Sequence, residues 1–181
     1  PGCKTAFVVG DGRKAQDYPG VADAIMVDWY PVPHLPLESA GDHVRMTAAI
    51  SGGRKVWAVL QAMDWRDFPQ NDARRRRVGR YPGRDEIRFM SYDAVLGGAQ
   101  GVWYFIFEHP VGSKLTDKPV FFRALTSVSR EMSALAPIFA RGRPIELPFA
   151  APAEGLAARA WTWRGRDYLV LANRSGSRFW K

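Results

Sequence analysis

The sequence predicts an α/β fold in which parallel strands alternate with helices and a short antiparallel β segment follows. Two observations predict this fold. Four short apolar runs lack the alternation of half-exposed strands, and such runs are typical of buried parallel strands. Helical patterns lie between most of these runs, which favours right-handed parallel crossovers. The composition of the 181 residues, 46% hydrophobic and 24% charged, is that of a globular chain.

The four predicted strands lie near residues 5–9, 24–28, 56–60 and 101–107. Each is rich in Val, Ile or aromatic side chains, which strands favour. The first link contains Pro19 and Gly20 and therefore offers little helix. The other links follow the order strand, helix, strand, helix, strand, helix.

Three helical patterns separate or follow these strands. Asp42 is placed to cap the first helix, and Asp117 with Pro119 opens the third, which Pro137 is expected to end. The second helix carries Asp85 and Glu86 in its first turn. Apolar residues recur at helical spacing in each pattern: Val44, Thr47, Ala48 and Ile50; Ile87, Met90, Ala94 and Val95; Leu125, Val128, Met132 and Leu135.

The pattern changes beyond residue 143. Residues 158–162 and 168–172 flank a turn at 164–167, which predicts a β-hairpin. We therefore divide the chain into an α/β unit over residues 1–143 and an incomplete β-rich segment over 144–181.

Five segments occur in an order and spacing that together are fairly specific. They are ADAIMVDWYP at 22–31, VWAVLQA at 56–62, EIRFMSYDAV at 86–95, GGAQGVWYF at 97–105 and YLVLAN at 168–173. The first four resemble the sixth strand, the seventh strand, the following helix and the lead into the eighth strand of a bacterial glycoside-hydrolase-like barrel. The fifth resembles a strand of the β-domain that often follows such barrels. The resemblance covers residues 4–175.

This resemblance implies that the chain is the C-terminal half of a TIM-type (β/α)8 barrel, followed by the start of a β-domain. Four more strands, and the acid/base carboxylate of related clans, would then precede Pro1, which we interpret as a cut point in a longer protein. An open half-barrel exposes apolar edges. The expected partner is therefore the missing N-terminal half or a second copy of the chain.

Barrel enzymes carry their sites at the C-terminal ends of the strands, and this rule selects the catalytic candidates Asp28 and Glu108. Asp28 ends an apolar run and precedes two aromatic residues. A carboxylate in that position can act as a general acid, a base or an acceptor for a sugar hydroxyl. The alternatives are that Asp28 caps the following loop or pairs with an arginine, and that Glu108 is a solvated loop acid.

The same rule selects substrate-binding candidates, which are Trp29, Tyr30, Gln61, Asp64 and Trp65. Indole and phenol rings can stack on the C–H faces of sugars. Gln61 can bond a sugar hydroxyl with both its donor and its acceptor, or it can be a buried amide that satisfies loop backbone. It stands where many retaining glycosidases of the resembled family carry a nucleophilic Glu. Trp103 lies inside a strand and is expected to pack in the core.

Several classes of site are not supported by the sequence. Cys3 is the only cysteine, so no intramolecular disulfide forms. The three histidines lack metal-ligand spacing, and neither a metal nor a cofactor is expected. No apolar run is long enough for a membrane span. The sequence shows no signal peptide and leaves the compartment unknown, although the resemblance is compatible with an extracytoplasmic location.

The formal charge of +8 is concentrated locally, because residues 66–84 contribute +5 of it. The run Arg74–Arg77 is either a solvated loop or a contact for anionic sugars or phosphate. Three functions stay open. The first is a glycoside hydrolase-like barrel that acts on an oligo- or polysaccharide. The second is a non-catalytic carbohydrate-binding relative. A basic nucleic-acid-binding protein is the least favoured.

Overall fold

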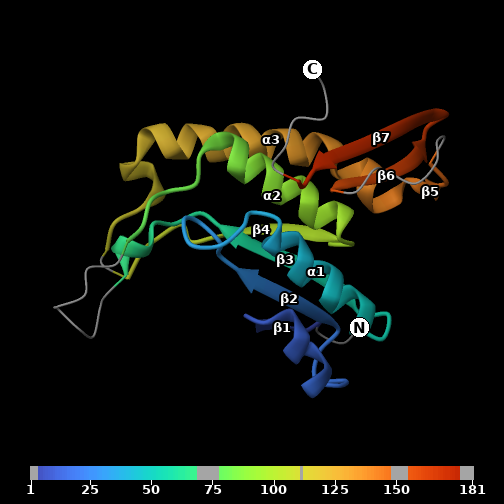
Figure 1. Ribbon diagram of the computed structural model, residues 1–181, viewed down its shortest axis with the longest axis horizontal. Coiled ribbons are helices and arrows are strands. Elements are labelled where there is room, and N and C mark those ends of the chain that lie inside the picture. The colour runs from blue at the N-terminus through green and yellow to red at the C-terminus, as the bar shows by residue number, and fades with distance from the viewer. Residues whose placement is uncertain (1–3, 69–77, 111, 148–154, 176–181) are drawn as a thin grey trace.

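The computed structural model describes residues 4–68, 78–110, 112–147 and 155–175 (Figure 1). The fold is mixed α/β, with one parallel and one antiparallel sheet. The parallel sheet has the spatial order β1-β2-β3-β4, formed by β1 (Ala6–Val9), β2 (Ala24–Trp29), β3 (Lys55–Gln61) and β4 (Gly101–Phe105). The four predicted strands are confirmed, with small shifts at their ends. Within the described residues, β1 and β4 each pair on one side only.

Helices α1 (Ser39–Ile50), α2 (Arg84–Leu96) and α3 (Pro119–Arg141) lie together on one side of the parallel sheet (Figure 1). Short 3-10 helices, η1 (Gly12–Asp17), η2 (Trp65–Asp67) and η3 (Leu115–Asp117), occupy three of the links. The second predicted helix is confirmed, with Asp85 and Glu86 in its first turn. Among the described helices, none has both the length and the apolar character needed to cross a lipid bilayer.

The N-terminal boundary predicted for α1 was wrong. The helix begins at Ser39, so that Glu38 occupies the N-cap position and Asp42 lies in the first turn. Asp42 is engaged in ion pairs with Arg45 and Arg174 rather than in capping. A carboxylate in the first turn still interacts favourably with the helix dipole, which is why the cap signal and the first-turn signal are hard to separate in a sequence.

Pro137 does not end α3, contrary to the expectation, because the helix continues to Arg141. A proline in a helix interior costs about 3 kcal/mol. The turn that follows it buries Ile138 and packs the ring of Phe139 5.2 Å from that of Trp161. Burial of an apolar side chain stabilises by about 1.5–3 kcal/mol, so these two side chains together offset the proline.

The two faces of the parallel sheet differ in what covers them. Side chains alternate along a strand, so Val27 and Trp29 of β2 and Leu60 of β3 face the helices and form a core cluster with α1 and α2. On the opposite face, Val8 is 57% exposed and Trp103 is 55% exposed. The expectation that Trp103 packs in the core was therefore wrong, because the residues on either side of it in the strand take the helix side.

The antiparallel sheet has the order β5-β6-β7, from β5 (Arg143–Ile145), β6 (Leu156–Trp163) and β7 (Arg166–Asn173). The predicted hairpin is confirmed as β6 and β7, which pair from Leu156 opposite Asn173 to Trp163 opposite Arg166. Trp161 belongs to the same core cluster as Val128 and Ile138 of α3. The antiparallel sheet therefore packs against α2 and α3 rather than standing apart from them.

Candidate functional site

The candidate site lies at the carboxyl ends of β2, β3 and β4, on the face of the sheet that the helices do not cover. Strand alternation directs Asp28 and Tyr30 to this face. The Tyr30 ring stacks on Phe105 of β4 at a centroid distance of 5.4 Å and meets Trp65 edge-on at 6.1 Å. Phe68 extends the stack, with its ring 6.3 Å from that of Phe105. The structure thus brings three of the predicted residues, Asp28, Tyr30 and Trp65, into one aromatic cluster.

Polar atoms in this cluster have no hydrogen-bond partner among the described residues. They are Oδ1 of Asp28, the hydroxyl of Tyr30 and Nε1 of Trp65, and all three are buried. A buried polar group without a partner costs about 1–3 kcal/mol, and folded chains contain few of them. The Tyr30 hydroxyl is near enough to the Asp28 carboxyl to lower its pKa, although the two do not form a hydrogen bond of good geometry. Polar atoms left in this state on neighbouring side chains indicate a place where a ligand can supply or order the missing bonds.

Burial is the main influence on the protonation of Asp28 and Tyr30. It raises the pKa of the Asp28 carboxyl, and the nearby Tyr30 hydroxyl lowers that pKa by a smaller amount. Burial, followed by the influence of Asp28, raises the pKa of Tyr30 as well. A carboxyl with a raised pKa is suited to hold a proton and to donate it, and Tyr30 stays a neutral donor.

Gln61 has its amide directed to backbone. Its Oε1 accepts from Val32 N at 2.8 Å, and its Nε2 donates to Val32 O at 2.8 Å and to Met63 O at 3.1 Å. The side chain is fully buried. Both N–H donors of the Gln61 amide are occupied, so this side chain holds the loop after β2 against the loop after β3, next to the candidate site.

Trp29 faces the helices and lies away from Asp28 and Tyr30. Its Nε1 donates to Ser39 Oγ at 3.0 Å, and its ring stacks on His43 at 3.7 Å. His43 Nδ1 accepts from Gly12 N at 3.0 Å, and burial lowers the pKa of His43, so the imidazole is neutral. Trp29 and His43 therefore join η1, β2 and α1 in the core.

Asp64 is buried but is engaged by Arg66. Its carboxylate accepts from Arg66 N at 2.9 Å and from Arg66 Nη2 at 2.5 Å. Burial raises the pKa of Asp64, but the bonds from Arg66 outweigh it, and the net shift is downward. A Cβ on Gly79 would overlap Asp64 Oδ1, so this position of the following segment requires glycine. Asp64 organises the loop that carries Trp65.

Glu108 lies at the rim of the site, shortly beyond the end of β4. Its side chain is exposed, and its backbone forms a single bridge with Lys114. Among the described carboxylates of this rim, three are engaged by other side chains: Asp11 by Arg13, Asp64 by Arg66 and Asp67 by Tyr81. Of the predicted catalytic candidates, Glu108 has no such engagement, and Asp28 is influenced by the Tyr30 hydroxyl without a hydrogen bond of good geometry.

The sequence did not reveal a group formed by Asp67, Tyr81 and His109. The Tyr81 hydroxyl donates to Asp67 and lies 3.4 Å from His109 Nε2, while His109 packs edge-on against Phe68 at 6.0 Å. His109 is buried, and its Nδ1 has no partner among the described residues. The position of His109 shortly after the fourth strand was a sequence signal for a site residue. Tyr81 follows a long loop, and nothing in the sequence indicated a role for it.

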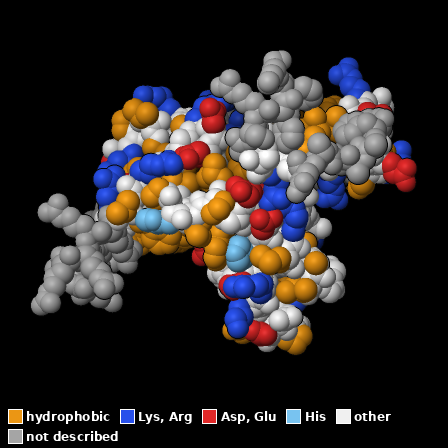
Figure 2. Space-filling view, viewed as in Figure 1, with side chains coloured by type: hydrophobic (Ala, Val, Ile, Leu, Met, Phe, Trp, Pro, Cys, Tyr) orange, Lys and Arg blue, Asp and Glu red, His pale blue; other side chains and the backbone are white. Residues whose placement is uncertain are grey.

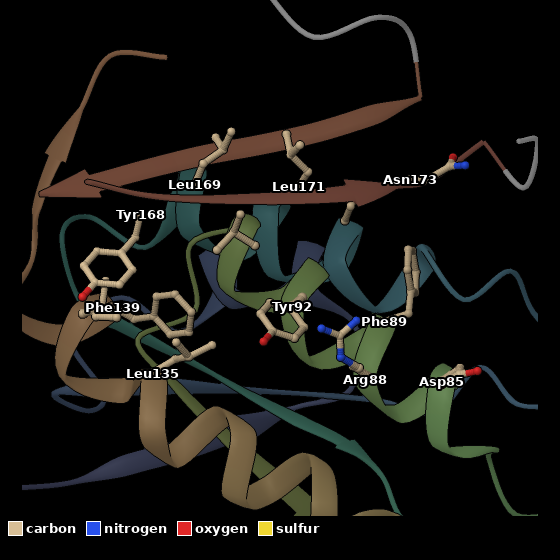
Figure 3. A pocket seen from close by; sticks show the side chains of 13 residues that line it. Asp85, Arg88, Phe89, Tyr92, Leu135, Phe139, Tyr168, Leu169, Leu171 and Asn173 are labelled. Atoms are coloured by element: carbon tan, nitrogen blue, oxygen red, sulfur yellow. The ribbon is translucent and has the colours of Figure 1, made fainter. Parts of the chain in front are cut away.

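Other parts of the molecule fit a ligand site less well. A groove of about 470 Å³ lies between β7, α2 and α3 (Figure 3), but its arginine, Arg88, is held by Glu131 at 2.8 Å. No cluster of three or more His, Cys, Asp or Glu side chains suited to a metal ion occurs in the described ranges. Arg74–Arg77 lies outside the described residues. Lys and Arg side chains are spread in separate groups over the face in Figure 2, with acidic side chains beside them.

Comparison with known proteins gives no relative. No protein family, no curated protein and no solved structure matches the chain. The geometry of the strand ends is therefore the basis for a functional conclusion.

Proposed function

We propose that this chain is carbohydrate-active and binds an oligo- or polysaccharide at the carboxyl ends of β2, β3 and β4. The observation that carries the proposal is the group of buried, unpartnered polar atoms on Asp28, Tyr30 and Trp65 inside an aromatic cluster. Sugars offer both kinds of contact that this group lacks. Their hydroxyls donate and accept hydrogen bonds, and their C–H faces pack on aromatic rings.

The fold that we propose for this function is the C-terminal half of a TIM-type barrel. Four parallel strands in sequential order, with helices on one side, support it. One face of the sheet is uncovered, and among the described residues β1 and β4 each pair on one side only. Both observations support a half-barrel, because a closed barrel needs further strands. The partner of this face is then a missing N-terminal barrel half or a second copy of the chain.

Hydrolysis is the first form of activity that we consider. The pKa of Asp28 is raised, as that of a general acid is, and Glu108 is a carboxylate of the rim that no described side chain engages. Glycosidases place two carboxyl groups about 5–10 Å apart across the scissile bond. The alternative is a carbohydrate-binding role without catalysis. Gln61 favours this alternative, because an amide that is bonded to backbone stands at the end of β3, where the resembled glycosidases carry a nucleophilic Glu.

The test is a binding and turnover comparison of Asp28→Asn with the unaltered chain. The variant keeps the shape of the side chain, so the fold is retained. Titration calorimetry with a panel of neutral oligosaccharides is expected to show at least about 10-fold weaker binding, which corresponds to about 1.4 kcal/mol. Asp17→Asn, an exposed change outside the site, is the matched control and should bind as the unaltered chain does.

Reducing-sugar release from the same oligosaccharides separates catalysis from binding. If the chain is a hydrolase, both Asp28→Asn and Glu108→Gln abolish release. If it only binds, no release occurs in any variant, and only Asp28→Asn weakens the affinity. Unchanged affinity and unchanged rate in Asp28→Asn would show that the site lies elsewhere.

A further inference from the structure

A second groove, of about 590 Å³, lies between the last turns of α3 and the turn that joins β6 to β7. Its charged lining consists of Arg141 from α3, Arg164 from the turn and Arg166 from the start of β7, while Trp163, Tyr168 and Ile138 form the apolar part. Elements far apart in the sequence therefore direct three guanidinium groups to one hollow.

The three arginines have no acidic counterpart within the described residues. None of them forms an ion pair, no described acidic side chain lines the groove, and all three are exposed. Asp167 is the second residue of β7, and strand alternation places it on the other face of the hairpin, where it accepts from Thr162 Oγ1 at 2.5 Å. The groove thus concentrates positive charge that the fold does not neutralise.

Arg164 occupies a backbone position that rarely holds an arginine. Its φ is 50° and that of Gly165 is 72°, both in the left-handed region. A two-residue hairpin turn with this backbone favours Asn-Gly or Gly-Gly, and a bulky residue in the left-handed region costs about 1–2 kcal/mol. The guanidinium lies 5.4 Å over the Trp163 ring. The arginine at this position therefore carries a local conformational cost, and its guanidinium lies at the groove.

We propose that this groove binds the oxyanions of an anionic polysaccharide, either uronate carboxylates or sulfate esters. Guanidinium groups bind such oxyanions through paired N–H donors. The saccharide class rests on the proposed function, and the groove adds a second contact for the same polymer, away from the strand ends. Nucleic acid fits less well, because Arg164 lies over the Trp163 ring and Trp161 is buried, so these indoles offer no free surface for stacked bases.

The experiment compares the full chain with a variant carrying Arg141→Gln, Arg164→Asn and Arg166→Gln. Asn suits the left-handed position, so the turn is preserved. Titration at low salt uses an oligogalacturonate, a sulfated oligosaccharide of the same length, and inorganic sulfate. Affinity for at least one of the two oligosaccharides is expected to fall at least about 10-fold in the variant, and the salt dependence of binding to become shallower. The oligosaccharide that responds identifies carboxylate or sulfate as the group bound.

A triple variant with Arg123→Gln, Arg130→Gln and Lys55→Gln removes the same charge at exposed positions elsewhere and is the matched control, so its affinity is expected to stay within about 2-fold of the unaltered chain. Equal losses in both variants would contradict the proposal, because binding would then follow net charge alone. Two other results would also overturn it: tighter binding of single-stranded RNA with loss in the groove variant, and binding of inorganic sulfate only. Neutral oligosaccharides carry no oxyanion, so the groove variant is expected to bind them as the unaltered chain does. Failure of neutral sugars to bind would therefore count against the strand-end site without touching the groove.

Discussion

Two aspartates of this molecule have buried carboxyl oxygens in contrasting surroundings. Asp93 of α2 is fully buried and lies 2.5 Å from Arg45 Nη2 of α1 and 3.1 Å from Arg174 Nε, just beyond β7. Asp28, half-buried at the end of β2, has an unpartnered Oδ1 beside the unpartnered hydroxyl of Tyr30. Burial is the largest influence on both carboxyls and raises the pKa of each. The partners, rather than the direction of the pKa shift, distinguish the two.

The Asp93 cluster is a structural connection. Arg174 also reaches Asp42 Oδ1 at 2.5 Å and Glu38 O at 3.2 Å, so it joins the antiparallel sheet to α1. A Cβ on Gly41 would overlap the Asp93 carboxylate, which shows how closely α1 approaches. The charges of this cluster satisfy one another. The strand-end cluster leaves its polar atoms open, as expected of a site that is completed by a ligand.

Loss of the Asp93 carboxylate should have the largest effect. Asp93→Ala leaves Arg45 and Arg174 without their shared partner, and breaking a buried ion pair costs about 3–5 kcal/mol. Chemical denaturation should show this loss in the free energy of unfolding, together with release of the β6–β7 hairpin in hydrogen exchange. Asp85→Ala, an exposed change in the first turn of the same helix, should cost at most about 1 kcal/mol. Similar stabilities for the two variants would contradict the structural assignment.

Gln61 provides the next test, because it lies near the open cluster but is itself satisfied. Gln61→Leu keeps the volume and leaves Val32 N–H and two carbonyls without their side-chain partner. Each of the three unsatisfied groups costs about 1–3 kcal/mol, and burial of the leucine side chain offsets part of this loss, so the expected net cost is about 3 kcal/mol. Gln100→Leu, at an exposed glutamine, is the control. A Gln61→Leu variant that folds with full stability but loses saccharide affinity would reassign Gln61 to direct ligand binding.

The sequence predicted the strands better than it predicted the positions of side chains around them. Continuous apolar runs locate β2 and β3, because a buried strand can be recognised from its own apolar residues alone. Whether a strand-end residue meets a ligand depends on contacts across the chain. Gln61 ends β3, and Asp64 and Trp65 follow it, yet only the fold shows that the loop backbone engages Gln61 and that Arg66 engages Asp64. Trp103 illustrates the same limit, because exposure of one sheet face has no signature within a single strand.

The smallest expected effect is on the stability of Asp28→Asn, and its sign is informative. The folded pKa of Asp28 is raised above the ordinary value of 3.8. In the pH range between these two values the folded state binds more protons than the unfolded state, so the stability of the unaltered chain falls as pH rises through that range. The amide that replaces the carboxyl in Asp28→Asn does not titrate, so the variant lacks this fall.

The free energy of unfolding of Asp28→Asn, minus that of the unaltered chain, should therefore increase from pH 3 upward and level off above the folded pKa. The total increase equals the rise in the Asp28 pKa at about 1.4 kcal/mol per pKa unit, and denaturant titrations of both proteins across this pH range measure it. Carboxyls with lowered pKa, such as Asp11 and Asp64, affect both proteins alike and cancel in the difference. A difference that decreases with pH would mean that the fold stabilises the Asp28 carboxylate, and Asp28 would then belong with Asp64, whose pKa a structural partner lowers.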